Sequence, residues 1–381
     1  MNASPSFANH PEPDATHASL EPWSLKEFPH HVESCLRDYF AAQEHLIDPI
    51  GSPVNESVSL LRDYVLGGGK RIRPTYAWAG FGAVGGWKDD EYNPAAVLKA
   101  VSSLEFIQAC ALIHDDYIDS SDTRRGNPTI HRSVEASHRS RGWRGSSEHF
   151  GASLSILIGD LAMVWADDMF HSSALPPQAL ARAFEPWRGM RTEVIGGQIL
   201  DIVNEASGSE SVDRAQRVNR FKTAAYTIER PLHIGATLAD GTPSQIAALR
   251  KYGRDIGIAF QLRDDLLGVF GDPAITGKPA GDDLREGKRT VLIAKAVQRA
   301  DARGDKEAAQ AIREGVGMVE SADDIAALAT IIRATGAEDD VEALISELTA
   351  QGLAHLADAE FEPGAVEALE ALADKATARR Y

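Results

Sequence analysis

Three aspartates at helical spacing follow a long apolar run, and this pattern restricts what the chain can fold into. Asp115, Asp116 and Asp119 come shortly after the apolar stretch LEFIQACALI. On a helix, residues four apart lie on one face, so Asp115 and Asp119 would stand one above the other with Asp116 beside them. Like charges at this spacing repel, and they repel far more strongly in an interior. A helix that presents them towards an interior therefore needs a cation.

A second acidic cluster follows another apolar helical run. Asp264 and Asp265 come shortly after the stretch IGIAF. Basic residues follow both clusters, namely Arg124 and Arg125 after the first and Lys278, Lys288 and Arg289 after the second. Carboxylate oxygens suit Mg²⁺, which completes its octahedron with waters and phosphate oxygens. One such motif alone would be interpreted as a solvated acidic turn, but two of them predict a single site that holds a polyphosphate through metal ions and basic side chains.

The rest of the chain has the pattern of an all-α protein. Alanine and leucine are abundant, only 18 of the 381 residues are proline, and stretches such as 95–113, 217–238 and 245–270 repeat apolar residues at helical spacing. No alternating strand pattern is evident. Helices are expected at 24–46 and 55–66, after a tail at 1–20 whose Pro, Ser and Asn content predicts disorder. The length alone allows two domains or one large helical domain.

Charge and cysteine content limit the possible partners and compartments. The chain carries 56 acidic and 39 basic residues, a formal net charge of −17, which argues against nucleic acid as a partner. An anionic substrate would have to be recruited by local cations and metal. Cys35 and Cys110 are too few for a disulfide scaffold and fit a reducing cytosol. No run of 18 apolar residues and no signal peptide is evident, so we expect a cytoplasmic protein with no transmembrane segment.

The loop GGGKRIRP at residues 67–74 is a candidate anion site. Its three glycines allow the backbone to approach an anion closely, and Pro74 suits the first turn of a following helix. The loop is not a P-loop, because neither Ser nor Thr follows the lysine. It could be an exposed basic loop. Beside two acidic sites, it is better interpreted as a diphosphate clamp with Lys70 as a point charge and Arg73 as a fork.

The helix before the first acidic cluster can be divided into faces. Counting back from Asp115 by 4, 7 and 11 residues gives Ala111, Gln108 and Leu104, which should share its side of the helix. Together with Cys110 and Ile107, Leu104 and Ala111 are predicted to line a pocket below the metal. Small side chains at 110 and 111 would leave depth for a ligand tail, although they could equally allow close helix packing.

Three other polar stretches are weaker candidates. The basic stretch at 138–151 is interpreted as a surface loop. Asp167 and Asp168 lack following cations, so pairing or capping is expected in place of metal binding. Lys222 and Thr223 lie in a helical pattern, where a lysine could be a ligand-binding residue or a surface residue with a buried stem.

These motifs together resemble the polyprenyl diphosphate synthases, the trans-prenyltransferases. GGGKRIRP, LIHDDYIDSSDTRRGNPTIH, FKT at 221–223 and FQLRDDLLGVFGDPAITGKPAGDDLREGKRT occur in the order and approximate spacing of that family, over about residues 25–300. The resemblance implies one all-α domain at 21–381, built as a bundle of antiparallel helices around a deep central cavity and usually homodimeric.

The resemblance also implies roles for individual residues. Two or three Mg²⁺ ions would be held by Asp115, Asp119 and Asp264, with Asp116 and Asp265 assisting. Isopentenyl diphosphate would bind to Lys70, Arg73 and Arg125, and an allylic diphosphate to Arg124, Lys222 and Lys278, with Lys288 as a further substrate-binding cation. Thr223 and Gln261 would lie near the reacting groups.

Two positions depart from the family pattern. Gln108 stands where many members carry a histidine that touches isopentenyl diphosphate, and glutamine can still donate a hydrogen bond. Gly268 replaces the last aspartate of the second acidic motif, which leaves one carboxylate fewer for metal.

Small residues at 110 and 111 argue against a farnesyl-length product in this family. We therefore expect geranylgeranyl diphosphate, with a longer polyprenyl chain as the alternative. A terpene cyclase or a head-to-head synthase would lack the GGGKRIRP clamp. A non-catalytic regulatory subunit would typically lose the first acidic motif, which is complete here.

Overall fold

The described part of the chain is almost entirely helical. The computed structural model describes residues 25–89, 91–271 and 281–378, so the tail expected at 1–20 and Lys278 lie outside the described residues. The N-terminal helices are α1 (Phe28–Ile47), α2 (Ser52–Leu66), α3 (Ile72–Ala83), α4 (Pro94–Ser102), α5 (Leu104–Ile118), α6 (Ile130–Ser140) and α7 (Ser147–His171). They are followed by α8 (Pro177–Ala206), α9 (Val212–Val218), the π-helix η3 (Asn219–Glu229), α10 (Arg230–Leu238) and α11 (Pro243–Phe270). The C-terminal helices are α13 (Asp282–Glu286), α14 (Val291–Ala302), α15 (Lys306–Gly315), α16 (Ala322–Ala334), α17 (Ala337–Ala354) and α18 (Ala365–Thr377).

Beyond these helices, the described residues form two short 3₁₀ turns, η2 (Gly86–Lys88) and η4 (His355–Asp358), and one hairpin. The hairpin pairs β1 (Thr123–Arg124) antiparallel with β2 (Asn127–Pro128). The all-α class is therefore confirmed, and the two short strands only connect α5 to α6.

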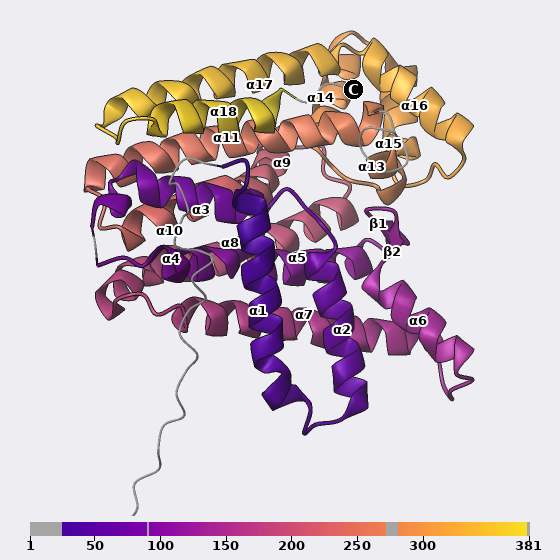
Figure 1. The fold of residues 1–381 in the computed structure, drawn as a ribbon. Coiled ribbons are helices and arrows are strands. Elements are labelled where there is room, and N and C mark those ends of the chain that lie inside the picture. The colour runs from indigo at the N-terminus through magenta and orange to yellow at the C-terminus, as the bar shows by residue number, and fades with distance from the viewer. Residues whose placement is uncertain (1–24, 90, 272–280, 379–381) are drawn as a thin grey trace, which may run out of the picture.

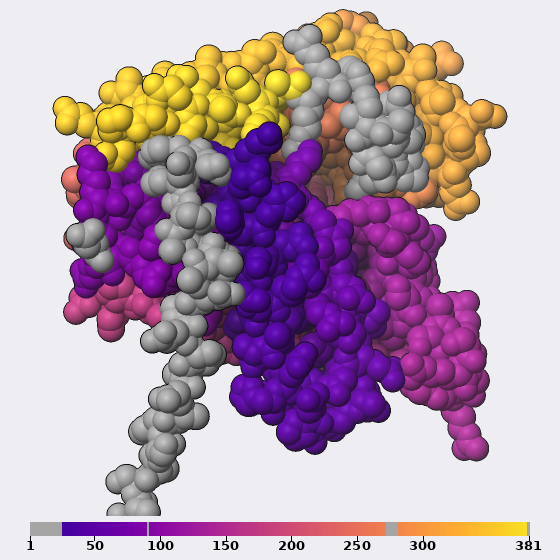
Figure 2. Space-filling view, in the orientation of Figure 1, coloured from indigo at the N-terminus to yellow at the C-terminus, as the bar shows by residue number. Residues whose placement is uncertain are grey.

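The helices are arranged in rows around α11 (Figure 1). The helix α11 packs against η3 on one side and against α17 and α18 on the other. The helix α8 packs on η3 and α10, and α5 packs on α7, while α1 and α2 run side by side across these rows. In space-filling view α1 and α2 form much of one surface, and the connection between α6 and α7 projects from the molecule (Figure 2).

Close backbone contacts hold the central helices together. A Cβ added at Gly257 of α11 would lie 2.6 Å from the Cα of Ala224 in η3, so only glycine lets these two helices approach so closely. A network of edge-on aromatic rings packs α1 against α5 and α7, with Phe40, Phe106 and Trp165 at its centre. These contacts fix the helices that carry the two acidic clusters.

One local prediction was wrong in part: the stretch 138–151 was expected to be a surface loop, and only 141–146 is an exposed connection without helix. The stretch 138–151 is mostly helical, because His138 belongs to α6 and Ser146 caps α7 by accepting a hydrogen bond from the backbone of His149. His138 is buried and packs against the rings of Trp143 and Phe150, which leaves only a short connection. The apolar stretch 95–113 is helical as expected, and it is divided between α4 and α5, which meet around Ser103.

Among the described residues, two stretches are long and apolar enough to cross a membrane by length and composition. They are 94–118 and 147–171. Of the most apolar part of each stretch, 78% is buried inside the protein in 94–118 and 44% in 147–171. Core helices of globular proteins pass the same test, so this is weak evidence for a membrane span. The expectation of no transmembrane segment stays a prediction.

Candidate active site

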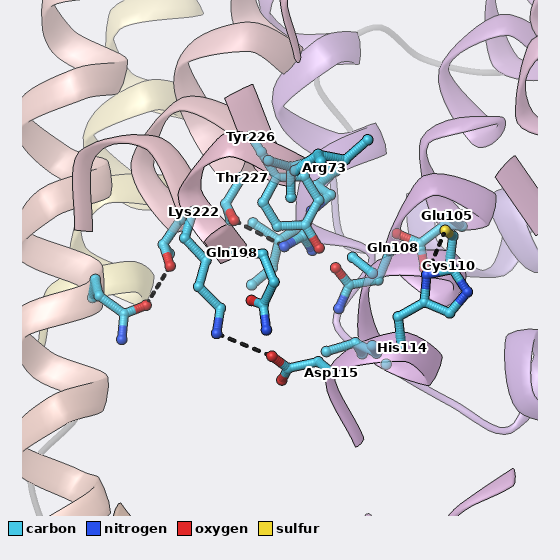
Figure 3. Close-up of a pocket in the computed structure, with 18 of the residues that line it drawn as sticks. Arg73, Glu105, Gln108, Cys110, His114, Asp115, Gln198, Lys222, Tyr226 and Thr227 are labelled. Carbon is cyan, nitrogen blue, oxygen red and sulfur yellow. Dashed lines mark hydrogen bonds and ion pairs between the residues drawn. The ribbon is translucent and has the colours of Figure 1, made fainter. Parts of the chain in front are cut away.

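A cavity of about 740 Å³ opens between α3, α5, α7, α8, η3 and α11. Side chains from both acidic clusters and from the glycine-rich loop reach it, and Figure 3 shows Asp115, Lys222 and Arg73 pointing into the same space. Residues far apart in the sequence therefore meet at one site, as the sequence predicts.

The first acidic cluster lies at the C-terminal end of α5 and is surrounded by cations. Lys222 Nζ lies 3.0 Å from Asp115 Oδ1 (Figure 3), and Arg124 reaches Asp115 Oδ2 at 3.7 Å. Arg124 also donates from Nε to Asp116 Oδ1 at 2.5 Å, where Asp116 has only 1% of its surface exposed. Lys288 Nζ forms an ion pair with Asp119 Oδ2 at 3.3 Å. Each carboxylate of this cluster therefore contacts at least one cation.

The two aspartates that share a helix face differ in acidity. Burial alone would raise the pKa of Asp115, but the surrounding lysines and arginine hold it at about 2. Burial raises the pKa of Asp119 to about 6, and the Asp115 carboxylate adds to this effect. This is the mutual repulsion expected from the i, i+4 spacing.

The π-helix η3 supplies the polar wall opposite α5. Lys222 bridges Asp115 to Asp201 of α8, 2.6 Å away. Thr223 donates to Gln261 Oε1 at 2.6 Å, and Gln261 in turn donates to Asp265 Oδ1 at 2.7 Å. Lys222 is thus a site residue rather than a surface residue with a buried stem. π-Helical segments often occur at functional sites.

The second acidic cluster lies on α11 and, like the first, combines a residue that lines the cavity with a buried one. Asp264 lines the cavity, whereas Asp265 has only 2% of its surface exposed and its Oδ2 has no hydrogen-bond partner. Burial raises the pKa of Asp265 to about 8, and the nearby Asp283 and Asp264 carboxylates contribute to the rise. A buried carboxylate oxygen without a donor can be satisfied by a metal ion or a metal-bound water.

Lys288 connects the first cluster to the acidic residues of α13. Its Nζ lies 3.3 Å from Asp119 Oδ2 on the first cluster, 2.9 Å from Glu286 Oε2 and 4.0 Å from Asp283 Oδ1. Glu286 also accepts a hydrogen bond from Ser121 at 3.1 Å. The ammonium group therefore sits between carboxylates from both halves of the site.

The glycine-rich loop and the second arginine after α5 form a basic corner. Arg125 donates to the carbonyl oxygen of Gly68, and its guanidinium lies 3.3 Å from where a Cβ would stand at Gly69. Arg125 and Gly126 both have positive φ, which is typical of a tight two-residue hairpin turn. The turn places Arg124 on the acidic cluster and Arg125 on the loop, where Lys70 also lines the cavity.

Arg73 enters the cavity from the first turn of α3. It donates to Thr227 Oγ1 at 2.8 Å, and its guanidinium carbon lies 3.8 Å from the ring centre of Tyr226. Burial lowers its pKa. Gln108 also lines the cavity (Figure 3), and its Oε1 has no hydrogen-bond partner.

Two of the four residues predicted to line a chain-length pocket line the cavity, and the control of chain length stays a prediction. Cys110 and Ala111 line the cavity. Leu104 and Ile107 do not, because neither has exposed surface and both pack in the hydrophobic core. Along α5 the cavity extends past Gln108 to Glu105 but does not include Leu104, although Leu104 has the helical spacing of a lining residue.

Several lining residues were missed by the sequence analysis. The apolar wall opposite α5 comes from Met163 of α7 and from Val194, Ile195 and Ile199 of α8. Gln198 and Tyr226 add polar atoms to the walls. One usable signal was the Gly196–Gly197 pair inside a helical pattern, which often marks a close approach between backbones.

Asp167 does not belong to the site. It accepts hydrogen bonds from Trp187 Nε1 and from Arg191, both at 2.7 Å. The expectation that this aspartate is paired is confirmed.

The donor set fits Mg²⁺ that is shared with a ligand. Among the described residues, no three His, Cys, Asp or Glu side chains are grouped so as to hold a metal ion by themselves. Mg²⁺ commonly binds through one or two carboxylates and takes its other ligands from water and substrate phosphates. Two separate acidic clusters, of three and two aspartates, beside a basic corner match that mode of binding.

The comparisons with known proteins agree with this geometry. The profile of one family, Polyprenyl synthetase, matches residues 55–330. A short chain isoprenyl diphosphate synthase of Methanothermobacter thermautotrophicus is 32% identical over 274 residues, which cover 71% of this chain and 76% of the relative. A geranylfarnesyl diphosphate synthase of Aeropyrum pernix is 34% identical over 279 residues, which cover 72% and 79%.

A solved structure is more similar still. The geranylgeranyl pyrophosphate synthase from Corynebacterium glutamicum, in complex with isoprenyl diphosphate and magnesium, is 62% identical with a TM-score of 0.92, and the match covers 94% of this chain and 100% of that one. Because the family profile and these relatives extend over most of the chain and include both acidic clusters, the chain belongs to the polyprenyl synthetase family of prenyl-transferring enzymes.

Proposed function

We propose that the protein condenses isopentenyl diphosphate with dimethylallyl, geranyl or farnesyl diphosphate and releases geranylgeranyl diphosphate. The observation that carries this proposal is the position of the two acidic clusters at one cavity. Lys222 and Lys288 contact the first cluster, and the cavity continues between apolar side chains of α7 and α8. Such a site has a polar end for two diphosphates and an apolar end for a prenyl chain.

The proposed Mg²⁺ ligands are aspartates. Asp115, Asp119 and Asp264 would hold Mg²⁺, with Asp116 and Asp265 assisting. When bound, Mg²⁺ supplies charge neutralisation to a departing diphosphate. Support comes from the buried, unpartnered Oδ2 of Asp265 and from the magnesium in the Corynebacterium glutamicum structure.

The cations divide between two diphosphates. Lys70, Arg73 and Arg125 would bind isopentenyl diphosphate at the basic corner, where Gln108 offers its amide. Lys222 and Arg124, which already contact Asp115, would bind the allylic diphosphate and stabilise the charge that develops on it. Lys288 would join them from the second cluster, and Lys278 is assigned there from its place in the motif.

The reaction needs a protected carbocation. The C1–O bond of the allylic substrate breaks, and its electron pair leaves with the diphosphate. The double bond of isopentenyl diphosphate then attacks C1 to form the new C–C bond, and the proton lost from isopentenyl diphosphate passes to the departed diphosphate. Thr223 and Gln261, joined by a hydrogen bond, orient polar atoms towards the cation, while the apolar walls exclude water.

A C20 product fits the depth of the cavity. Small side chains at Cys110 and Ala111 leave space beside α5, and the structure at 62% identity is named a geranylgeranyl pyrophosphate synthase. The relatives at lower identity do not distinguish product lengths, because one is named geranylfarnesyl and another farnesyl diphosphate synthase. A longer product is the alternative. The complete first acidic cluster argues against a regulatory subunit.

We also propose a homodimer that uses α7 and α8. Large apolar side chains are exposed on both helices, with Leu157 at 60%, Val164 at 56% and Ile199 at 56%. A large exposed apolar surface on a monomer often marks a site of protein association. A second copy related by two-fold symmetry would cover it with the same surface. Because Ile195 and Ile199 also line the cavity, that copy would help to keep the prenyl tail dry. The free thiols of Cys35 and Cys110 support a cytoplasmic location.

Product analysis tests the proposed function. The purified protein would be incubated with Mg²⁺, labelled isopentenyl diphosphate and each of the three allylic starters in turn. The dephosphorylated products would then be separated by chain length. We expect a dominant C20 alcohol. Longer alcohols would overturn the product assignment, and no condensation by folded protein with any starter would overturn the proposed reaction.

A further inference from the structure

The glycine-rich loop contains a buried cation, Arg71, between the two that are proposed to bind isopentenyl diphosphate. Lys70 is exposed and Arg73 is half-buried, but Arg71 is only 4% exposed. Its Nη1 donates to Glu105 Oε2 at 2.6 Å, and its Nη2 donates to the backbone oxygen of Val65 at 2.8 Å. Arg71 therefore uses its guanidinium inside the protein, where it joins the end of α2 to the start of α5.

The backbone of Arg71 is held in an unfavourable conformation. Its φ of 48° and ψ of 40° lie in the left-handed region, which residues other than glycine adopt only where surrounding contacts enforce it. The backbone oxygen of Arg71 accepts hydrogen bonds from Thr75, at 3.1 Å from the backbone nitrogen and at 2.7 Å from Oγ1. Contacts to α2, α3 and α5 thus fix the turn from which Lys70 and Arg73 reach the cavity.

The partner of Arg71 acts on a second arginine. Glu105 is buried in the first turn of α5 and lines the cavity. Burial lowers the pKa of Arg73, and the neighbouring Tyr226 and the Glu105 carboxylate oppose this effect. Glu105 is therefore close enough to influence two arginines. Arg71 forms the ion pair with it, whereas Arg73 donates to Thr227 and lies over the ring of Tyr226 (Figure 3).

We propose that Arg71 is a positioning residue for isopentenyl diphosphate, because its ion pair with Glu105 leaves the Arg73 guanidinium available to the diphosphate. The inference rests on the proposed function and adds a residue that acts through another. Without Arg71, Glu105 would be a buried charge that lacks its partner, which is costly. Arg73 would then turn towards Glu105 and away from the diphosphate.

The direct test is the binding of isopentenyl diphosphate, measured by isothermal titration calorimetry. Arg71→Met should raise the Kd by about tenfold to a hundredfold, which corresponds to the loss of one hydrogen bond to a charged group. Arg230→Met is the matched control, since it removes another buried arginine that holds a glutamate, Glu193, with two hydrogen bonds. It should bind as the wild type does. Wild-type affinity in Arg71→Met protein would overturn the proposal.

A change at Glu105 separates this mechanism from simple support of the loop. Glu105→Gln keeps an acceptor for Arg71 but removes the negative charge, so its affinity should stay close to that of the wild type. The double variant Arg71→Met with Glu105→Gln should bind more tightly than Arg71→Met, because no carboxylate is left to attract Arg73. A folded double variant that binds as weakly as Arg71→Met would overturn the proposal.

The double variant also covers the case in which Arg71→Met alone does not fold. It contains no buried charge that has lost its partner, and we expect its affinity to lie near that of Glu105→Gln. A folded double variant that binds isopentenyl diphosphate tenfold or more weakly than Glu105→Gln would then overturn the proposal.

Steady-state kinetics provides a readout that a general loosening of the site would not give. Arg71→Met should raise the KM for isopentenyl diphosphate and leave the KM for farnesyl diphosphate unchanged, since Lys222 and Arg124 are proposed to bind the allylic diphosphate. An equal rise of both KM values would show that α5 as a whole has moved, and would overturn the proposal. Wild-type protein that binds no isopentenyl diphosphate would contradict the proposed function itself. Normal wild-type binding that is unaffected by Arg71→Met would contradict only the role of Arg71.

Discussion

At the scale of single residues, burial and charge act against each other throughout the site. Asp115 stays ionised because cations surround it, whereas Asp265 is deeply buried near other carboxylates and has a pKa of about 8. The same physics gives Arg73 a lowered pKa beside the ring of Tyr226. Sequence spacing predicted which carboxylates share a face, but the degree of burial depends on helices that come from elsewhere in the chain.

The side chain at residue 111 should control product length. Ala111 lines the cavity on α5, so Ala111→Phe would add a ring where the prenyl tail is expected to extend. We expect the main product to become shorter than C20, with chain length read from the dephosphorylated alcohols. Ala326→Phe, on an exposed position of α16, should leave the product unchanged. An unaltered product from Ala111→Phe would show that the tail does not pass along this face.

Another buried residue makes stability depend on pH. His233 on α10 is only 8% exposed, and burial, followed by the charges of Arg250 and Arg230, lowers its pKa to about 3. An unfolded histidine has a pKa of about 6.5, so between about pH 3 and pH 6.5 the unfolded state binds one more proton. The contribution of His233 to the free energy of unfolding is complete above about pH 6.5. It is lost as the pH falls, by up to about 1.4 kcal/mol per pH unit.

Urea unfolding at about pH 5 and about pH 7 would measure this effect. His233→Gln should reduce the loss of unfolding free energy between the two values, whereas His45→Gln, on an exposed position of α1, should keep it. Equal losses in wild type and His233→Gln would show that another group is responsible.

At the scale of helices, the sequence predicted the elements better than their contacts. The apolar runs before Asp115 and Asp264 do lie in the helices α5 and α11, because periodicity is a local property. The π-helical form of η3 and the walls supplied by α7 and α8 were not predicted, since they depend on packing between distant segments. The misplaced Leu104 has the same cause: its helical spacing was correct, but the cavity ends before it.

The contact between α8 and η3 depends on Gly197. A Cβ there would lie 2.3 Å from the backbone nitrogen of Lys222, so Gly197→Ala should push η3 away and weaken the Lys222–Asp115 pair. We expect a loss of about 1–3 kcal/mol in unfolding free energy together with reduced turnover. Gly196→Ala, with open space around its Cβ, is the matched control and should keep the wild-type unfolding free energy and turnover. Normal stability and turnover in Gly197→Ala would refute this role.

At the scale of the whole molecule, the net charge of −17 makes local cations essential. The basic residues of the site come from four segments that only folding brings together, so their arrangement could not be read from composition. The exposed apolar residues of α7 and α8 likewise come from separate parts of the sequence, and their exposure is evident only in the folded protein.

The exposed apolar side chains of α7 and α8 lead to a prediction about the assembly of the protein. Ile199→Asp would place a charge in each half of a two-fold interface, so we expect monomers at concentrations where the wild type is dimeric. Analytical ultracentrifugation would measure the masses. Met318→Asp, at a side chain that is 77% exposed between α15 and α16, should leave the dimer intact. A wild type that sediments as a monomer at all concentrations would exclude the homodimer.

The central claim is that the two acidic clusters act together in metal-assisted prenyl transfer. The most direct measurement is the rate at which labelled isopentenyl diphosphate is joined to farnesyl diphosphate in the presence of Mg²⁺. Asp115→Asn and Asp264→Asn should each lower this rate by at least about a hundredfold while circular dichroism shows an unchanged helical fold. Asp63→Asn, on the exposed surface of α2, should leave the rate unchanged. Near-normal turnover by either cluster variant would contradict the account.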